Sequence, residues 1–227
     1  MRERLFRLYH LMFRALGPQR WWPARSRFEV LVGAMLTQNT AWANVERAIA
    51  SLRAAGALPP KTLAALPRPR LARLIRSAGY YNIKAQRLQN LLRYLKSRCR
   101  LSLPRLFRVP PEALRRELLA VKGVGPETAD SILLYAGDIP IFVVDAYTRR
   151  VLARHGIVRP NATYEEMQAL FMGHLPHDAA LFNEYHALLV MVGKDYCRTV
   201  PRCAVCPLRP DLPPGGPRPL GRRSRRR

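Results

Sequence analysis

Residues 117–151 read ELLAVKGVGPETADSILLYAGDIPIFVVDAYTRRV, and this stretch decides the fold. It predicts a helix that ends at a Gly-x-Gly turn at 123–125, a second helix to about Ala136, and a loop that ends at Asp145. Glycines between helices permit positive φ and a close backbone approach. Their N–H groups, beside the positive end of the next helix, form a seat for a phosphate. A phosphate seat linked to a fixed carboxylate suits an enzyme that grips DNA and attacks a sugar.

Each part of this stretch also has an ordinary explanation, because Gly-x-Gly turns join many helices and Asp145 alone could cap a helix. Taken together, the parts resemble the helix-hairpin-helix DNA glycosylases of the endonuclease III superfamily. The hairpin of that family reads L-x-G-V-G-x-x-T-A, and its catalytic acid lies in V-D-x-x-x-x-R-V. This sequence has VKGVGPETA at 121–129 and VDAYTRRV at 144–151, and the 3-methyladenine glycosylase branch is the most similar.

The resemblance covers residues 20–212 and implies an all-α fold of two helical lobes with the DNA cleft between them. A six-helix lobe is expected over 27–136, ending in the hairpin at 121–127. The second lobe is expected to combine 1–26 with 137–212 and to carry the aspartate and a cysteine loop. Helical periodicity alone supports only the all-α class, because alternating strand patterns are scarce. It predicts helices at 2–16, 26–38, 41–55, 61–66, 70–77, 82–98, 111–120, 126–136, 145–155, 163–173 and 178–194.

The composition is strongly basic, with 39 Lys and Arg against 15 acids and a formal net charge of +24. Such an excess indicates a polyanionic partner, most commonly nucleic acid, although a solvated or membrane-surface basic face is the alternative. No apolar stretch is long enough for a transmembrane helix, and the basic start lacks a signal-peptide pattern. A soluble cytoplasmic protein of a prokaryote, associated with the nucleoid through DNA and monomeric, is therefore expected. Residues 213–227 are rich in Pro, Gly and Arg, which predicts a disordered basic tail.

The resemblance assigns Asp145 as the catalytic residue. Cleavage of an N-glycosidic bond builds positive charge on the sugar, and a fixed carboxylate stabilises that state. Family members that also cut the strand carry a lysine two residues after the second hairpin glycine, where this chain has Glu127. A carboxylate cannot form a Schiff base. The sequence therefore predicts a monofunctional glycosylase that leaves an intact abasic site.

Several residues are predicted to bind double-stranded DNA that contains a damaged base. The base must leave the stack, so a side chain is needed to fill the gap. Gln38, in the run LTQNT, matches the glutamine that fills this gap in the family, and a polar residue at a helix end is the alternative. The predicted phosphate contacts are Lys122, Gly123, Val124 and Gly125.

The three tryptophans lie close in sequence to the LTQNT run and are predicted to form the base pocket. Trp21 and Trp22, followed by proline, and Trp42 resemble the aromatic residues that hold the base in 3-methyladenine glycosylases. An alkylated purine is cationic, and indole faces attract cations. Ordinary core packing is the alternative. Relatives that excise adenine carry an acid at the position of Gly33, so that specificity is excluded.

Three cysteines, Cys197, Cys203 and Cys206, resemble the [4Fe–4S] loop of many family members, where four thiolates hold the cluster. The fourth ligand is expected at position 212, which is Leu212 and cannot ligate. A cluster could use Asp211 or Cys99 instead, or the loop could persist without a cluster. A zinc site that includes His174, His177 or His186 is a further alternative. Free thiols are another. The motif favours an iron–sulfur cluster with a structural role, presenting Arg198, Arg202 and Arg209 to DNA.

The sequence thus predicts a DNA base-excision glycosylase for alkylated purines. One alternative is an endonuclease III-like glycosylase for oxidised or mismatched pyrimidines. The other is a non-catalytic DNA-binding module in which Asp145 only caps a helix.

Overall fold

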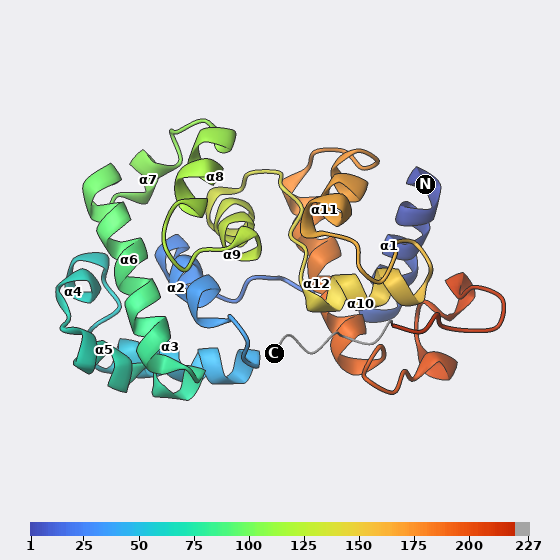
Figure 1. Ribbon diagram of the computed structural model, residues 1–227, viewed down its shortest axis with the longest axis horizontal. Coiled ribbons are helices and arrows are strands. Elements are labelled where there is room, and N and C mark those ends of the chain that lie inside the picture. The colour runs from blue at the N-terminus through green and yellow to red at the C-terminus, as the bar shows by residue number, and fades with distance from the viewer. Residues whose placement is uncertain (221–227) are drawn as a thin grey trace. The chain divides into compact units, whose positions relative to one another are not determined.

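The computed structural model describes residues 1–220, and these residues form helices and loops without a β-strand (Figure 1). The all-α prediction is therefore confirmed. The chain divides into two compact units. The hairpin unit is Trp22–Ile139, and the aspartate unit combines Met1–Trp21 with the chain from Pro140 onward. No helix of the described part is both long and apolar enough to cross a membrane.

The hairpin unit is built around α2 (Arg27–Leu36), whose residues from Phe28 to Leu36 are all buried. The helix starts where it does because the Ser26 hydroxyl accepts a hydrogen bond from the N–H of Glu29. Leucines at helical spacing on α6 contribute a second apolar face to the same core. The remaining helices of this unit are α3 (Trp42–Ala54), α4 (Pro60–Ala65), α5 (Arg68–Leu74), η1 (Arg76–Ala78), α6 (Tyr81–Cys99), α7 (Leu103–Leu106), α8 (Pro111–Leu119), α9 (Pro126–Ser131) and η2 (Ile132–Ala136).

The aspartate unit packs its N-terminal helix, α1 (Arg2–Leu16), against α12 (Ala179–Asp195). The buried Tyr185 on α12 donates its hydroxyl to the carbonyl of Leu5 at 2.8 Å. Its ring meets the stacked rings of Phe142 and Phe171, whose centroids are 3.7 Å apart. The unit also contains α10 (Ala146–Arg154), α11 (Tyr164–Met172), η3 (Cys203–Val205) and η4 (Arg209–Asp211).

Three local features differ from the predictions. The helix expected over 126–136 changes to a π-helix, η2, in its second half. The short helix α7 was not predicted, because Pro104 was read as a breaker although proline is tolerated in a first helical turn. Residues 213–218 are not disordered as expected: they form a turn, and the N–H of Arg218 donates to the carbonyl of Arg154. The rest of the predicted tail, 221–227, lies outside the described residues.

Candidate functional site

The hairpin turn between α8 and α9 needs glycine at position 123 for two reasons. Gly123 has a φ of +101°, which side-chain-bearing residues rarely adopt. A Cβ atom there would also lie 2.3 Å from Cγ of Arg87 on α6. The backbone of the turn is therefore pressed against the arginine side chain, which places a guanidinium beside the hairpin.

Side-chain amides fix the carbonyl groups of the turn. Asn90 donates from Nδ2 to the carbonyl of Lys122 at 2.8 Å, and Gln38 donates from Nε2 to the carbonyl of Gly123 at 3.0 Å. Gln38 also donates to the hydroxyl of Thr128 and accepts a hydrogen bond from Arg87 at 2.6 Å. The nitrogen of the Gln38 amide thus binds the hairpin, and its oxygen binds Arg87 of α6.

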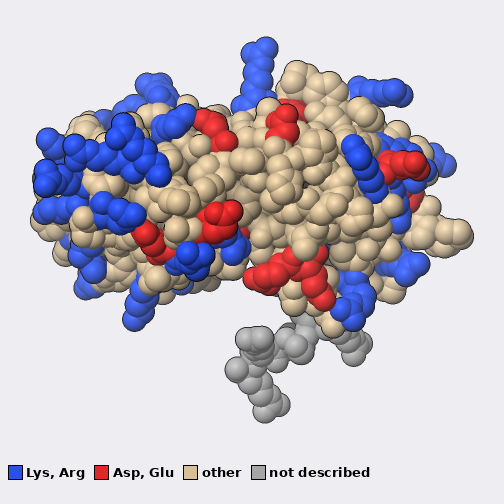
Figure 2. Space-filling view, turned by 90° about the horizontal axis from the view of Figure 1, so that it is seen from above, with Lys and Arg blue, Asp and Glu red and all other residues tan. Residues whose placement is uncertain are grey.

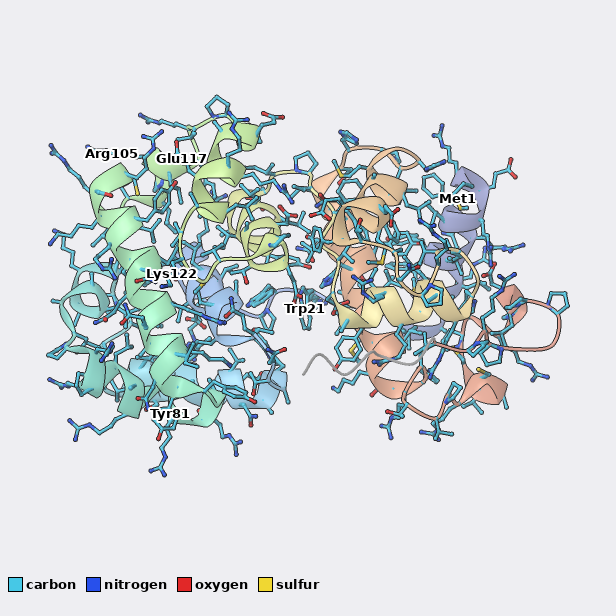
Figure 3. All side chains as sticks on the ribbon, in the orientation of Figure 1. Met1, Trp21, Tyr81, Arg105, Glu117 and Lys122 are labelled. Atoms are coloured by element: carbon cyan, nitrogen blue, oxygen red, sulfur yellow. The ribbon has the colours of Figure 1, made fainter. Side chains whose placement is uncertain are left out.

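The N–H groups of the turn differ in their availability. Val124 donates its N–H to the carbonyl of Val121 at 2.9 Å, and its side chain is buried. In the described part of the chain, the N–H groups of Gly123 and Gly125 have no such partner. The side chain of Lys122 is exposed and lies beside the middle of α6 (Figure 3). Of the predicted phosphate contacts, the N–H groups of Gly123 and Gly125 and the ammonium of Lys122 therefore remain, whereas the N–H of Val124 is already engaged.

A buried lysine joins two loops of the hairpin unit. Lys84 is 2% exposed, and its Nζ donates to the carbonyl of Leu36 at 2.8 Å and to that of Ala78 at 2.7 Å. Leu36 ends the helix before Gln38, and Ala78 precedes the turn into α6. Burial, with a smaller contribution from Arg87, lowers the pKa of Lys84 to about 8. This role of Lys84 was not predicted, although the residue lies in the run GYYNIKA at 79–85.

The predicted base pocket contains one well-defined aromatic cluster. The Trp22 indole lies over Gly33, where a Cβ atom would approach it to 3.2 Å. Trp22 meets Trp42 edge to face, with centroids 5.0 Å apart and planes at 89°, and it also contacts Tyr135 at 5.1 Å. Tyr135 comes from the π-helix η2, a geometry often found at functional sites. Since the two indoles are perpendicular, they do not form a ready-made parallel slot.

The two tryptophans line an open hollow of the hairpin unit together with acidic side chains. Glu29 is 4% exposed, and both its oxygens accept hydrogen bonds from Arg53, at 2.9 and 3.0 Å. Glu46 also lines the hollow and is exposed to solvent. Trp21, the third predicted pocket residue, belongs to the other unit and is half-buried.

Asp145 caps α10 and is partly accessible. Its Oδ1 accepts a hydrogen bond from the N–H of Thr148 at 2.7 Å, and its side chain is 12% exposed. Its Oδ2 lies 3.9 Å from Nε2 of His186 on α12. Burial lowers the pKa of His186, although the charge of Asp145 opposes that shift. One carboxylate oxygen therefore holds the start of α10, and the other faces the buried imidazole of His186.

The three cysteines of the C-terminal loop line one small cavity, and Leu212 lines it too. The cavity holds about 10 Å³, room for about one water molecule. Arg154 places its Nη1 3.3 Å from Sγ of Cys197, and burial raises the pKa of the Cys203 and Cys206 thiols. Within residues 1–220, no group of three or more His, Cys, Asp or Glu is placed to hold a metal ion.

Asp211, the alternative fourth ligand, is already engaged. Its carboxylate accepts hydrogen bonds from Arg4 at 2.8 and 3.0 Å, from Arg7, and lies 3.1 Å from Nδ1 of His155. Burial alone would raise the pKa of Asp211, but the bonds from Arg4 and Arg7 outweigh burial and lower it. Cys99 belongs to the hairpin unit, where it is buried. The described residues therefore do not fit a cluster held by four protein ligands.

Comparison with known proteins identifies the class. The HhH-GPD superfamily of base excision DNA repair proteins matches residues 32–177. A Methanocaldococcus jannaschii protein provisionally named a DNA repair glycosylase is 43% identical over 209 residues, covering 91% of this chain and 94% of its own. The endonuclease III of Bacillus subtilis is 30% identical over 182 residues, covering 80% of this chain and 78% of its own.

Two solved structures extend the comparison. H. pylori 3-methyladenine DNA glycosylase bound to 1,N6-ethenoadenine has a TM-score of 0.71 at 29% identity, covering 85% of this chain and 96% of that one. An endonuclease III–DNA complex has a TM-score of 0.79 at 25% identity, covering 93% and 95%. The chain therefore belongs to the HhH-GPD superfamily of base excision DNA repair proteins. As a member, it is a DNA base-excision repair glycosylase.

Proposed function

We propose that this glycosylase releases alkylated purines of the 3-methyladenine type from duplex DNA and leaves the strand intact. The observation that carries the proposal is the Trp22 indole, held over Gly33 beside Trp42 in a hollow with acidic side chains. An alkylated purine is cationic, and an indole face attracts a cation by about 0.5–2 kcal/mol. The exposed carboxylate of Glu46 also lines this hollow, as do Arg25 and Arg53, the latter paired with Glu29.

The position of Gly33 also argues against the excision of unmodified adenine, for which relatives carry an acid at this position. An acid at this position would have to occupy the space that the Trp22 indole fills. A protonating side chain and the indole therefore exclude one another. The likeness to a 3-methyladenine glycosylase that carries a bound modified adenine supports the same substrate class.

The bond cleavage is assigned to Asp145. Its Oδ2 lies 3.9 Å from Nε2 of the buried His186, and this carboxylate stabilises the positive charge of the developing oxocarbenium ion. A charge pair at ~4 Å in a partly screened site contributes ~4 kcal/mol, which is about a thousandfold in rate. An alkylated base leaves readily, so this stabilisation and an attacking water suffice.

The DNA contacts are assigned to the hairpin and to the residue tied to it. The amides of Gly123 and Gly125 and the ammonium of Lys122 bind a phosphate, and Gln38 enters the gap left by the flipped base. Entry of Gln38 would break its bonds to the hairpin, so gap filling and support of the hairpin turn compete for one side-chain amide.

The strand stays intact in this proposal because no lysine lies at the nucleophile position. Glu127 occupies it, at the exposed start of α9, and Lys122 lies on the other side of the turn. Glu127 supplies no amine for a Schiff base.

An endonuclease III-like activity on oxidised or mismatched pyrimidines is the second candidate. The higher TM-score with the endonuclease III–DNA complex, 0.79 against 0.71, favours it. The two candidates differ in the base that is released rather than in the DNA contacts.

Base release from a duplex panel tests the proposal: 3-methyladenine, thymine glycol, G·T and G·U duplexes, each with and without alkali. Free 3-methyladenine, with strand breaks only after alkali, is the expected result. Release of a pyrimidine instead favours the second candidate, and DNA binding without any base release favours a non-catalytic module. Trp22→Ala is expected to lower alkylpurine release more than Trp21→Ala, because Trp22 packs on Gly33 and against Trp42.

A further inference from the structure

One face of α6 carries cations that no acid of the described chain neutralises. Arg93, Lys96 and Arg100 are exposed and follow one another at helical spacings of three and four residues. None of them forms an ion pair within residues 1–220. On the other flank of the helix, Arg98 is neutralised by Glu117 of α8 at 2.8 Å. The cations that face away from α8 therefore remain available to an external anion.

This face is continuous with the hairpin. Gln86 and Asn90 precede Arg93 on the same face, and Asn90 donates directly to the carbonyl of Lys122. Gln86 and Asn90 also line a hollow with Lys122 and with Arg68, whose guanidinium donates to Gln86 at 2.7 Å. We call the face formed by Gln86, Asn90, Arg93, Lys96 and Arg100 the α6 strip. It begins in the hollow beside the phosphate seat and runs toward the C-terminal end of α6.

The figures agree with this placement. Figure 3 shows Lys122 beside the middle of α6, with Tyr81 at one end of the helix and Arg105 near the other. Figure 2 shows Lys and Arg side chains gathered over the outer end of the hairpin unit, with few acidic ones among them. The positive charge therefore extends well beyond the hairpin itself.

We propose that the α6 strip binds the phosphate backbone of duplex DNA that flanks the damaged site, beyond the segment gripped by the hairpin. This inference rests on the proposed role of the hairpin as a DNA phosphate seat. From Gln86 to Arg100 a helix rises roughly 20 Å, at about 1.5 Å per residue. A DNA strand carries a phosphate about every 3.4 Å along its axis, so the strip spans roughly six nucleotides. The match of length and charge favours a duplex flank over a small anion.

The amide and guanidinium groups of the strip suit this partner. Arginine donates in a planar fork that fits phosphate oxygens, and the strip reads no bases, so it adds affinity without sequence preference. The C-cap position of Arg100 has a left-handed backbone, with φ of 53°, and the side chain there is exposed. The strip thus ends on a cation held outside the regular helix.

The test compares two triple variants in DNA binding and base release. The strip variant is R93Q/K96Q/R100Q, and the matched control R105Q/R108Q/R116Q removes the same charge from exposed arginines of α7, α8 and the loop between them. Glutamine keeps helix propensity, and thermal melting checks that both variants fold. Binding to an undamaged 24-base-pair duplex is measured from 50 to 200 mM salt, and the logarithm of affinity is plotted against the logarithm of salt concentration. Each lost phosphate contact reduces the slope by about 0.9.

The strip variant is expected to lose about 2–3 units of slope, whereas the control loses less than about one. In a second series, a duplex that carries a lesion is shortened on one side of that lesion. This shortening should weaken DNA binding by the wild-type protein and leave DNA binding by the strip variant unchanged. Base release from a saturated short duplex should be the same in all three proteins. An unchanged slope in the strip variant, or an equal loss in the control, overturns the inference. Failure of the proposed substrate class would appear separately, as absent alkylpurine release by the wild-type protein whatever its salt slope.

Discussion

Oδ2 of Asp145 lies 3.9 Å from Nε2 of His186, and burial lowers the pKa of that imidazole. Oδ1 of the same aspartate caps α10 through the N–H of Thr148. In the proposed reaction, one side chain therefore combines a structural task with the charge needed at the sugar. The two tasks can be separated, because asparagine caps helices as well as aspartate does.

Asp145→Asn is expected to lower the base-release rate about a thousandfold while the unfolding free energy changes little, since the cap survives and only the charge is lost. Single-turnover release and urea unfolding measure the two quantities. Asp145→Ala provides the contrast, because it removes the cap as well and should cost about 1 kcal/mol of stability. Equal rates for the wild type and the asparagine variant would show that Asp145 acts only as a cap.

Glu127→Lys places an amine at the position where strand-cutting relatives carry theirs. We expect this variant to form a borohydride-trappable adduct with an abasic duplex, and the wild type to form none. Denaturing gels of the trapped mixture measure the adduct, with Glu127→Gln as the matched control. A trapped adduct with the wild-type protein would contradict the intact-strand assignment and direct attention to Lys122.

Gln38→Ala removes two hydrogen bonds that hold the hairpin, those to the carbonyl of Gly123 and to the hydroxyl of Thr128. At roughly 1 kcal/mol each, the unfolding free energy should fall by about 1–2 kcal/mol, and base release should fall as well. The control is Gln89→Ala, whose amide binds the carbonyl of Leu66 away from the hairpin. Lost release with full stability would assign Gln38 to the DNA gap alone.

Lys84→Met tests the buried bridge between two loops. The folded pKa of Lys84, about 8, lies below its ordinary value of 10.5, so the unfolded chain binds more protons between these two pH values. The free energy of unfolding of the wild type should therefore rise with pH from about 8 to 10.5, relative to that of the methionine variant. Urea unfolding at half-unit steps of pH measures this difference. A constant difference across the range would mean that the ammonium is not penalised by burial.

Asp211→Asn tests the network that ties the C-terminal loop to α1. The lowered pKa of Asp211 means that its contribution is complete above its ordinary value of 3.8 and is lost as the pH falls through the folded value. The variant should be less stable than the wild type at pH 6, with the difference in unfolding free energy vanishing in acid. Urea unfolding at several pH values measures it.

Iron and sulfide analysis of the wild type should give less than one [4Fe–4S] cluster per chain, because Leu212 supplies no ligand. A full [4Fe–4S] content would show that a ligand from outside the described residues completes the site.

Much of the architecture could be predicted because helical periodicity and prolines mark most helices to within a few residues. Capping residues such as Ser26 and Asp178 lie where the pattern requires them. The π-helix η2 escaped prediction because its five residues are all apolar and buried, so they carry no periodic signal. The short α7 escaped for the opposite reason, since one proline outweighed the surrounding pattern.

The sequence allowed the candidate site residues to be named, but not the side-chain contacts between them. The pairing of Arg87 with Gln38 joins residues 49 positions apart, and the indole of Trp22 over Gly33 joins a loop to a helix, so neither contact follows from a local sequence pattern. The engagement of Asp211 by Arg4 was equally hidden, because 207 residues separate them. A charge pattern shows which groups need partners, while only the folded chain shows which groups meet.

The aspartate unit is made of two segments that are far apart in the chain, so the two units cannot fold at the same time during synthesis. The hairpin unit is a continuous segment and can fold once Ile139 has left the ribosome. The apolar face of α1, with Leu5, Leu8 and Met12, is covered only when Tyr185 has been made. At about 5–20 residues per second, Tyr185 emerges roughly ten to forty seconds after α1. During that interval the nascent chain presents an unpaired hydrophobic helix, so chaperone binding should concentrate on its first twenty residues.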